Sequence, residues 1–378
     1  MAGRTQAALY EEINLELSWS EAELPQAART KHVHSLHPYL GKFVPQLVEF
    51  FLRRCFEPGD CVYDPFVGSG TTLVEANAYG AHAIGCDISA FNCLISRVKT
   101  QAHAPASLEM ELRRILEDAQ QRPDRDASSA SEWLANWYSP RALSELLRYR
   151  DAAMEASPQV RDVANLILCR SARSARLTTH FDLDFPPTPA RGPYWCHKHK
   201  RECRPVETAS QFLRRYLLDT LARVKEFSRV RDGVRAAEML HGDASLLDLG
   251  GPYDGVITSP PYPGLIDYHE QHRYAYELLG LEDRRETELG AAERGTSRAA
   301  LAAYANGIVE VLANVRRSLQ PRAPVCIVVN DRRDLYPEIL DRAGLRLEER
   351  LERHVNRRTG RRAGEYFESI LVARFARD

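Results

Sequence analysis

The sequence predicts an α/β protein with a mostly parallel sheet, interrupted by a mainly helical insertion. Short apolar runs alternate with helical patterns in the first and last thirds of the chain, whereas the middle of the chain contains helical patterns without a convincing strand. At 378 residues, of which 44% are hydrophobic, the chain is long enough to bury a large core. We therefore expect one large domain or two of ordinary size.

The first α/β unit follows a polar N-terminal segment over 1–36. Residues 45–56, "PQLVEFFLRRCF", have helical apolar spacing with a proline in the first turn. The next predicted elements are a strand in "CVYD" at 61–64, a helix in "TTLVEANAY" at 71–79 that ends on Gly80, and a strand in "AHAIGCDI" at 81–88. A strand, a helix and a strand within about thirty residues form a βαβ unit, which implies parallel strands.

Residues 101–235 break this alternation, and we interpret them as a helical insertion. Helical periodicity covers 107–120, 141–155, 159–172 and 206–229. The α/β pattern returns over 236–378, with strands in "YDGVITS", "VCIVVN" and "YFESILVARF" and a helix over 300–319. The run Val256–Thr258 must end at Ser259, because the two prolines that follow cannot donate to a sheet ladder. Residues 37–100 and 236–378 are thus expected to form one core.

Charge and cysteine content narrow the class of protein. The 51 basic and 52 acidic residues give a net charge of −1, so binding to a polyanion must depend on local basic patches. Eight cysteines are spread along the chain without a disulfide framework, and the first thirty residues lack an apolar signal segment. No membrane span is visible in the sequence. These features lead us to expect a cytoplasmic location.

A glycine-rich turn, "DPFVGSGTT" at 64–72, lies between a predicted strand and a predicted helix. In this position Gly68 and Gly70 allow a ligand to approach the backbone amides closely. A phosphate-binding P-loop needs a lysine and a longer glycine spacing, and a dinucleotide site needs a third glycine where this chain has Leu73. Asp87, nineteen residues after Gly68, stands at the distance typical of a ribose-binding carboxylate. The pattern indicates a nucleoside cofactor without a diphosphate; the alternative is a plain tight turn.

The glycine turn followed by "TSPPY" at 258–262 resembles the S-adenosylmethionine-dependent amino-methyltransferases of DNA, which modify cytosine N4 or adenine N6. The similarity extends to "HPYLGKF" at 37–43, "GCDIS" at 85–89, "HGDAS" at 241–245 and "DYHEQHRYAYELLG" at 267–280. It covers roughly 31–100 and 236–378, outside the helical insertion. The resemblance implies a Rossmann-like methyltransferase core, S-adenosylmethionine as cofactor and a flipped base of double-stranded DNA as substrate.

The resemblance gives the proline loop the catalytic role. An exocyclic amine is a poor nucleophile because its lone pair is delocalised into the ring, so it needs acceptors for its hydrogens. The Ser259 hydroxyl and the Pro260 carbonyl would be these acceptors, with Pro261 helping to hold the loop rigid. Tyr262 would stack on the flipped base, which offsets part of the cost of extraction. Methyl passes directly from sulfonium to nitrogen, so no cysteine nucleophile is needed.

The resemblance also implies a set of cofactor-binding residues. Asp64, Pro65, Phe66, Gly68 and Gly70 would hold the methionine part, Thr71 and Thr72 would begin the helix, and Asp87 would bind the ribose. Ile88 would pack on the adenine, Asp243 and Ala244 would form the amine-binding side, and Tyr39, Lys42 and Phe43 would close over the methionine carboxylate. The alternatives are a solvated surface lysine at Lys42 and a helix N-cap at Asp243.

The first residue of the proline motif indicates which base is methylated. In this family a serine there accompanies cytosine N4 more often, and asparagine or aspartate accompanies adenine N6. Ser259 therefore favours cytosine N4, with adenine N6 and an RNA amine as alternatives. Many serine-type members have the proline motif before the glycine turn, so the subgroup stays open. A DNA-binding regulator on a decayed methyltransferase scaffold is the alternative from another class.

The insertion is the candidate for target recognition. Its segment "RGPYWCHKHKRECRP" at 191–205 contains basic and aromatic residues suited to phosphates and unstacked bases, namely Arg191, Tyr194, Trp195, Lys198, Lys200, Arg201 and Arg204. A second basic run, "RHVNRRTGRR" at 353–362, includes Arg357 and Arg358 and is expected to lie against the DNA backbone. A solvated basic surface is the alternative for both segments. A cognate restriction enzyme is a candidate partner.

No metal site is predicted. Cys196, His197, His199 and Cys203 are close in sequence, but their spacing fits no common zinc finger. Adjacent Cys196 and His197 cannot easily both reach one tetrahedral ion. Zinc binding by these four residues is kept as the alternative.

Overall fold

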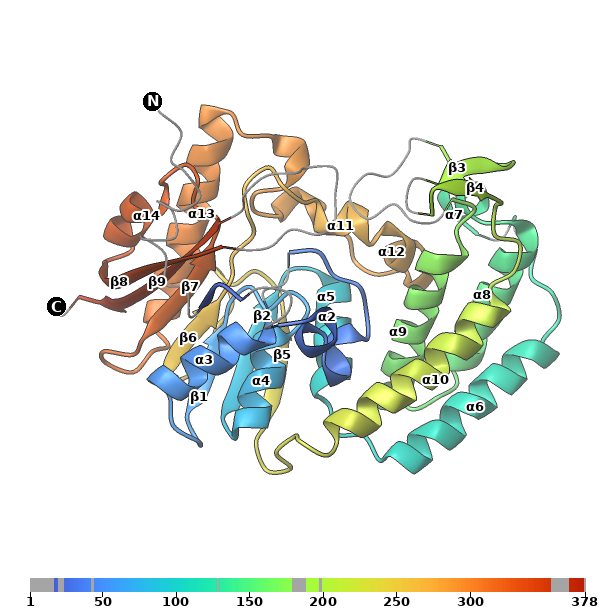
Figure 1. The fold of residues 1–378 in the computed structure, drawn as a ribbon, viewed down its shortest axis with the longest axis horizontal. Coiled ribbons are helices and arrows are strands. Elements are labelled where there is room, and N and C mark those ends of the chain that lie inside the picture. Colours follow the sequence, from blue (N-terminus) through green and yellow to red (C-terminus); the bar gives the residue numbers. More distant parts are fainter. Residues whose placement is uncertain are drawn as a thin grey trace.

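The computed structural model describes residues 17–19, 24–41, 44–126, 128, 130–178, 188–196, 199–354 and 367–376. A seven-stranded sheet carries helices on both faces, and a layer of long helices lies beside one end of the sheet (Figure 1). The α/β class with a mostly parallel sheet is therefore confirmed.

The strand order of the main sheet is β5-β2-β1-β6-β7-β9-β8. The strands are β1 (Cys61–Asp64), β2 (His82–Asp87), β5 (Ala237–His241), β6 (Gly255–Thr258), β7 (Val325–Val329), β8 (Leu345–His354) and β9 (Phe367–Phe375). β9 runs antiparallel to β7 and β8, and the other neighbouring pairs are parallel. After β1 the chain adds β2 and then β5 on one side of the sheet, and after β6 it adds β7, β8 and β9 on the other side. This switch of direction is where open α/β sheets bind ligands.

The helices outside the insertion come from the N-terminal segment and from both α/β segments. They are α2 (Gln26–Arg29), α3 (Pro45–Cys55), α4 (Thr71–Tyr79), α5 (Ala90–Thr100), α11 (Tyr268–Gln271), α12 (Arg273–Leu279), α13 (Arg298–Arg316) and α14 (Tyr336–Arg342), with a 3-10 turn η2 at His32–Ser35. One face of the sheet packs with α3 and α4 through Val62 and Ile257, and the other packs with α13 and α14 through Tyr63 and Val256. Burial on both faces explains why the inner strands are continuous apolar runs.

The insertion consists of α6 (Pro105–Gln121), α7 (Glu132–Trp137), α8 (Pro140–Ala153), α9 (Pro158–Ala175) and α10 (Ser210–Phe227). Its apolar residues do not form a separate core. Leu112, Leu146 and Ile167 belong to one buried cluster with Phe91 of α5 and Tyr274 of α12. This shared cluster fixes the helical layer to the α/β part. The division of the chain into a methyltransferase core and a recognition insertion remains a proposal.

Most predicted elements are confirmed, including the mainly helical insertion, and one small element was missed. The strand before the prolines ends at Thr258, and Gly80 ends α4 with φ +91°. The insertion nevertheless contains a hairpin, β3 (Tyr194–Cys196) paired with β4 (Arg201–Cys203). Strands of three residues are too short to show an alternating pattern. β8 also lacks an apolar run, because at the sheet edge most of its side chains are polar and partly or fully exposed.

All eight cysteines of the chain are free thiols in the structure. Within the described ranges, no helix combines the length and the apolar character that crossing a membrane requires.

Candidate active site

The glycine turn and the proline loop lie side by side because they follow β1 and β6, which are neighbours in the sheet. Two hydrogen bonds connect them directly. Thr258 Oγ1 donates to Asp64 Oδ1 at 2.6 Å, and Thr72 Oγ1 donates to the Ile257 carbonyl at 3.3 Å. All four residues are buried. The glycine turn and the proline loop are thus held in fixed relation to each other.

A cavity with about 1020 Å³ of empty space, part of it open to solvent, lies at this junction. The predicted site residues on its wall are Tyr39, Pro65, Phe66, Gly68, Thr71, Asp87, Ile88, Asp243, Ala244, Ser259 and Pro261. Five other predicted site residues are not on this wall, namely Asp64, Gly70, Thr72, Pro260 and Tyr262. Two more, Lys42 and Phe43, lie outside the described residues. The structure therefore gathers most of the predicted cofactor residues around one space.

The glycine turn needs its glycines because other elements press against it. Gly70 has φ +80°, and a Cβ there would lie 2.9 Å from Ser96 Oγ and 3.1 Å from Ser96 Cα on α5. Gly68 has φ +49°, and its Cβ would lie 3.1 Å from the Tyr39 hydroxyl. Buried Lys99 also donates to the Ser69 carbonyl at 2.6 Å. The turn is packed tightly between α5 and Tyr39, so both glycines meet a steric as well as a conformational requirement.

Asp87 at the end of β2 is held in place by three donors. Its Oδ2 accepts from the Gly68 amide at 2.9 Å, and its Oδ1 accepts from the Ser89 amide at 2.8 Å and Asn92 Nδ2 at 3.1 Å. Desolvation nevertheless raises the pKa of Asp87 to about 6, against the opposite effect of these hydrogen bonds. Its carboxylate is therefore positioned and ionised at neutral pH, ready to accept from a ligand hydroxyl.

The cavity wall carries negative charge. Asp87, Asp243, Glu288 and Glu310 contribute carboxyl groups, and no lysine or arginine is present among the wall residues that the structure describes. Such a surface attracts a cation and repels a phosphate group. The cavity thus suits a positively charged nucleoside cofactor better than a dinucleotide.

Ser259 is the predicted acceptor for the substrate amine, and its hydroxyl hydrogen is already engaged. Ser259 Oγ donates to the Val328 carbonyl at the end of β7 at 2.9 Å. A hydroxyl has one hydrogen and two lone pairs, so this bond leaves the oxygen as an acceptor only. Ser259 also lies on the cavity wall, and its oxygen remains the predicted acceptor for the substrate amine.

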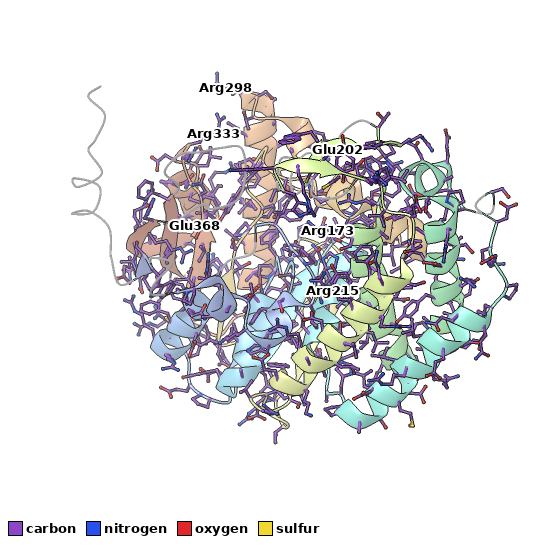
Figure 2. The ribbon with its side chains drawn as sticks, turned by 45° about the vertical axis from the view of Figure 1, so that its right-hand side comes forward. Arg173, Glu202, Arg215, Arg298, Arg333 and Glu368 are labelled. Atoms are coloured by element: carbon purple, nitrogen blue, oxygen red, sulfur yellow. The ribbon has the colours of Figure 1, made fainter. Side chains whose placement is uncertain are left out.

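Tyr262 is fixed by a buried ion pair that the sequence did not indicate. Its hydroxyl donates to Glu368 Oε1 at 3.3 Å, and Arg353 Nε donates to Glu368 Oε2 at 2.9 Å. Arg353 and Glu368 are 4% and 7% exposed, so this pair is shielded from solvent. Figure 2 shows Glu368 among the strands at the β8–β9 end of the sheet. The contact sets the orientation of the Tyr262 ring.

One wall of the cavity consists of residues to which the sequence assigned no role. Tyr268 stacks on Tyr39, with ring centroids 5.5 Å apart and planes at 17°. His269 Nδ1 pairs with Glu288 Oε2 at 2.7 Å, and His269 Nε2 accepts from the Arg284 amide at 3.3 Å. Tyr268 and His269 lie in the segment 267–280 that carries part of the resemblance. Glu288 belongs to no motif, and only the folded chain brings it to the site.

Asp243 does not cap a helix, because a turn and not a helix follows it in the structure. Its Oδ1 accepts from the Ser245 amide at 2.8 Å and from Ser245 Oγ at 2.7 Å, and its carbonyl accepts from the Leu247 amide at 3.0 Å. These bonds stabilise the turn after β5. Asp243 also lies on the cavity wall, so the turn holds a carboxylate toward the ligand space.

The residues predicted to bind DNA lie mainly on the β3–β4 hairpin. Arg191, Lys200, Arg201 and Arg204 are exposed, Trp195 is 59% exposed, and Tyr194 is half-buried. Lys198, Arg357 and Arg358 lie outside the described residues. Figure 1 places β3 and β4 at the upper right, and Figure 2 marks the hairpin by Glu202 and the beginning of α13 by Arg298, both on the upper side of the molecule.

Comparison with known proteins agrees with the sequence motifs. A family model described as DNA methylase matches residues 8–97. The type II methyltransferase M.MjaII of Methanocaldococcus jannaschii is 36% identical, and the alignment covers 95% of this chain and 84% of that protein. The type II methyltransferase M.BsoBI of Geobacillus stearothermophilus is 23% identical over 71% of this chain and 57% of its own length. A SAM-dependent methyltransferase structure from Methanosarcina mazei matches with a TM-score of 0.34 and 8% identity, covering 86% of this chain and 96% of that chain.

Proposed function

Because the chain belongs to the S-adenosylmethionine-dependent DNA amino-methyltransferases, we propose that it methylates N4 of a cytosine flipped out of duplex DNA. The observation that carries the proposal is Ser259, whose hydroxyl donates to the Val328 carbonyl and so presents only lone pairs at the cavity wall. Serine in this position is the form that favours cytosine N4 in the family. The exocyclic amine of cytosine needs such an acceptor for one of its hydrogens.

The cavity fits the cofactor of this family. S-adenosylmethionine supplies an electrophilic methyl group on a positively charged sulfur. The carboxyl groups of Asp87, Asp243, Glu288 and Glu310 provide the opposite charge around it. Asp87 would accept from the ribose hydroxyls, and the apolar side chain of Ile88 would pack on the adenine. The tight turn at Gly68 would bring backbone amides to the methionine part.

The proline loop would align the target amine with the methyl group. The Ser259 oxygen and the Pro260 carbonyl would accept its two hydrogens, which draws the nitrogen lone pair out of conjugation with the ring. The bond between Thr258 and Asp64 keeps this pair of acceptors in register with the glycine turn. The catalytic contribution of the chain is then mainly positioning, worth up to roughly 7–11 kcal/mol in well-oriented reactions.

Identification of the methylated nucleoside tests the proposal. We expect that duplex DNA treated with the enzyme and S-adenosylmethionine, then digested and analysed by mass spectrometry, contains N4-methylcytosine as its new modified nucleoside. Finding N6-methyladenine in its place would overturn the assignment to cytosine. A heat-inactivated enzyme serves as the control for modification already present in the DNA.

Cofactor affinity is expected to fall in mild acid because of Asp87. Its pKa of about 6 in the free protein means that the carboxylate is ionised at pH 7.5 and mostly protonated at pH 5. Only the ionised form accepts from both ribose hydroxyls, so the Kd for S-adenosylmethionine should rise about tenfold between these pH values. Calorimetric titration at both pH values measures this change.

Two asparagine variants separate Asp87 from other acidic groups. Asp87→Asn should bind the cofactor more weakly at pH 7.5 and lose most of the dependence on pH. Asp64→Asn should keep that dependence, because Asp64 has a similarly raised pKa of about 6 but does not lie on the cavity wall. An unchanged Kd of the wild-type protein between pH 7.5 and pH 5 would contradict the role given to Asp87.

A further inference from the structure

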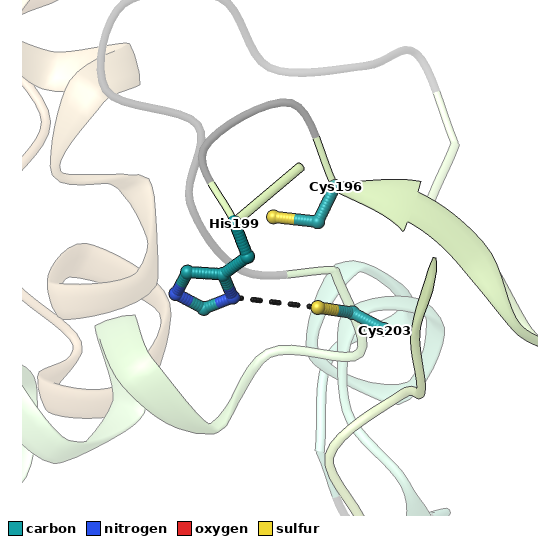
Figure 3. A group of neighbouring side chains, drawn as sticks. All are labelled: Cys196, His199 and Cys203. Carbon is teal, nitrogen blue, oxygen red and sulfur yellow. Dashed lines mark hydrogen bonds between the residues drawn. The ribbon is translucent and has the colours of Figure 1, made fainter. Parts of the chain in front are cut away.

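The β3–β4 hairpin brings three zinc-binding side chains together, well separated in sequence from the residues of the cavity. The ligand atoms of Cys196, His199 and Cys203 all lie within 4.8 Å of one another. Their side chains point toward a common space in Figure 3, where His199 Nδ1 is 3.4 Å from Cys203 Sγ. We propose that these three side chains bind one Zn²⁺ ion. This proposal departs from the sequence prediction that the chain has no metal site.

The pairing of the hairpin explains why the side chains converge. Cys196 pairs with Arg201, and Tyr194 pairs with Cys203. Because side chains alternate between the faces of a strand, both cysteines lie on the same face of the ribbon as diagonal neighbours. His199 belongs to the connection between the strands. Of the two sequence objections, the one about adjacent Cys196 and His197 does not apply to a site that uses His199; the spacing still matches no common zinc finger.

The observed separation of His199 and Cys203 is close to that in a zinc tetrahedron, and all three ligand atoms lie within 4.8 Å of one another. Bond lengths of about 2.3 Å for Zn–S and about 2.0–2.1 Å for Zn–N place a sulfur and a nitrogen ligand about 3.6 Å apart and two sulfurs about 3.8 Å apart. His199 Nδ1 and Cys203 Sγ already have a separation of 3.4 Å. Small side-chain rotations therefore suffice to bind the ion. Since His199 is exposed, water would occupy the fourth position.

A disulfide is the less suitable use of the two cysteines. Diagonal neighbours on a two-stranded ribbon have Cα atoms roughly 7–8 Å apart, whereas most disulfides join residues whose Cα atoms are about 4.4–6.8 Å apart. Two thiolates also neutralise the charge of Zn²⁺, so the ion adds no net charge beside exposed Lys200, Arg201 and Arg204. Zinc prefers thiolate and imidazole ligands, which are what Cys196, Cys203 and His199 provide.

The buried cluster of His32, His34 and Glu75 has similar spacing but is a poorer site. Lys31 Nζ lies 2.9 Å from Glu75 Oε2, and His34 Nε2 lies 2.7 Å from Glu75 Oε1. The ammonium group already compensates this carboxylate and would repel a metal cation. Of the two clusters among the described residues, we therefore expect only the one on the hairpin to bind zinc.

The role that we give to the ion rests on the proposed function, methylation of duplex DNA. A two-stranded ribbon is at best marginally stable by itself, and each strand here has only three residues. A bound metal would hold the ribbon in one conformation. Trp195 alternates to the face opposite the cysteines and is 59% exposed. A zinc-stabilised hairpin would thus hold exposed Trp195 in a fixed position for contact with DNA, on a segment that also carries exposed Lys200, Arg201 and Arg204.

Metal analysis of the purified protein tests the site itself. We expect about one equivalent of zinc per chain after dialysis, measured by inductively coupled plasma mass spectrometry. Cys203→Ser and His199→Ala should each lose most of it. Cys55→Ser, which changes a half-buried cysteine in α3, should retain it. Replacement by Co²⁺ should give thiolate-to-metal charge-transfer bands that Cys203→Ser weakens. Wild-type protein without zinc and without such bands after Co²⁺ addition would overturn the proposal, and so would variants that keep the metal.

Binding measurements on the same variants test the role of the ion. Cys203→Ser should bind duplex DNA at least fivefold more weakly and bind S-adenosylmethionine with unchanged Kd, which also shows that it is folded. Zinc loss without any change in DNA affinity would overturn the positioning role. Failure of the proposed function would appear differently, as wild-type protein that contains zinc and forms no N4-methylcytosine.

Discussion

Replacing Ser259 with alanine is expected to lower kcat on duplex DNA by about 10²–10³-fold, the scale of losing one positioned hydrogen-bond group at a reacting centre. The variant loses the oxygen that accepts from the target amine, while the residues that surround the cofactor stay in place. The Kd for S-adenosylmethionine should therefore remain within about twofold. Single-turnover transfer of labelled methyl, together with calorimetry, separates the two effects.

Ser171→Ala provides the matched control. Ser171 on α9 is buried, and its hydroxyl donates to the Ile167 carbonyl at 2.7 Å, a bond of the same kind as that between Ser259 and Val328. It lies outside the cavity wall and should leave kcat unchanged. If Ser259→Ala turned over at a rate close to that of Ser171→Ala, the acceptor role of Ser259 would have to be abandoned.

Replacing Tyr262 with alanine is expected to lower kcat/KM on duplex DNA by roughly 10–100-fold. This range corresponds to the loss of about 1–3 kcal/mol when a base no longer stacks on an aromatic ring. The cofactor Kd should not change, because Tyr262 is not on the cavity wall. Steady-state kinetics on a short duplex with one target site measures the effect.

Tyr262→Phe distinguishes the ring from its hydroxyl. The phenylalanine keeps the stacking surface and loses the hydrogen bond to Glu368 Oε1, so kcat/KM should fall less than about tenfold. Equal losses in the alanine and phenylalanine variants would show that the bond to Glu368, and not stacking, is what the reaction needs. An alanine variant with wild-type kcat/KM would remove Tyr262 from the mechanism.

The elements around the site were predictable because their signals are local. The two prolines that follow Ser259 prevent β6 from continuing past Thr258. The turn after β1 needs positive φ angles at residues 68 and 70, and the sequence has glycine at both positions. Both motifs follow parallel strands, so their meeting at one edge of the sheet follows from general rules of α/β topology. These rules also placed Asp87 beside the glycine turn.

The remaining parts of the site depend on contacts between distant residues. Glu368 reaches Tyr262 across 106 residues of sequence, and Thr258 reaches Asp64 across 194. Nothing near Glu368 or Glu288 in the sequence marks them as site residues. The predicted role of Asp64 toward the methionine part stays a prediction, and the structure adds a contact that the sequence did not indicate, because Asp64 is buried and accepts from Thr258.

The hairpin also shows where prediction from the sequence fails, because here the sequence argued against a site that the fold brings together. Spacing along the chain argued against a metal, because Cys196 and His197 are adjacent. Strand pairing brings Cys196, His199 and Cys203 together without His197. Short strands with mixed polar residues give no periodic signal, so the arrangement becomes visible only in three dimensions.

A crystal structure with a non-reactive cofactor analogue and a duplex containing one target site tests the central claim most directly. The claim is that the glycine turn and the proline loop form one continuous site across β1 and β6. We predict that the analogue's ribose contacts Asp87 and that the target amine lies within hydrogen-bond distance of Ser259 Oγ. An analogue bound away from Asp87, or an amine far from Ser259, would contradict the account.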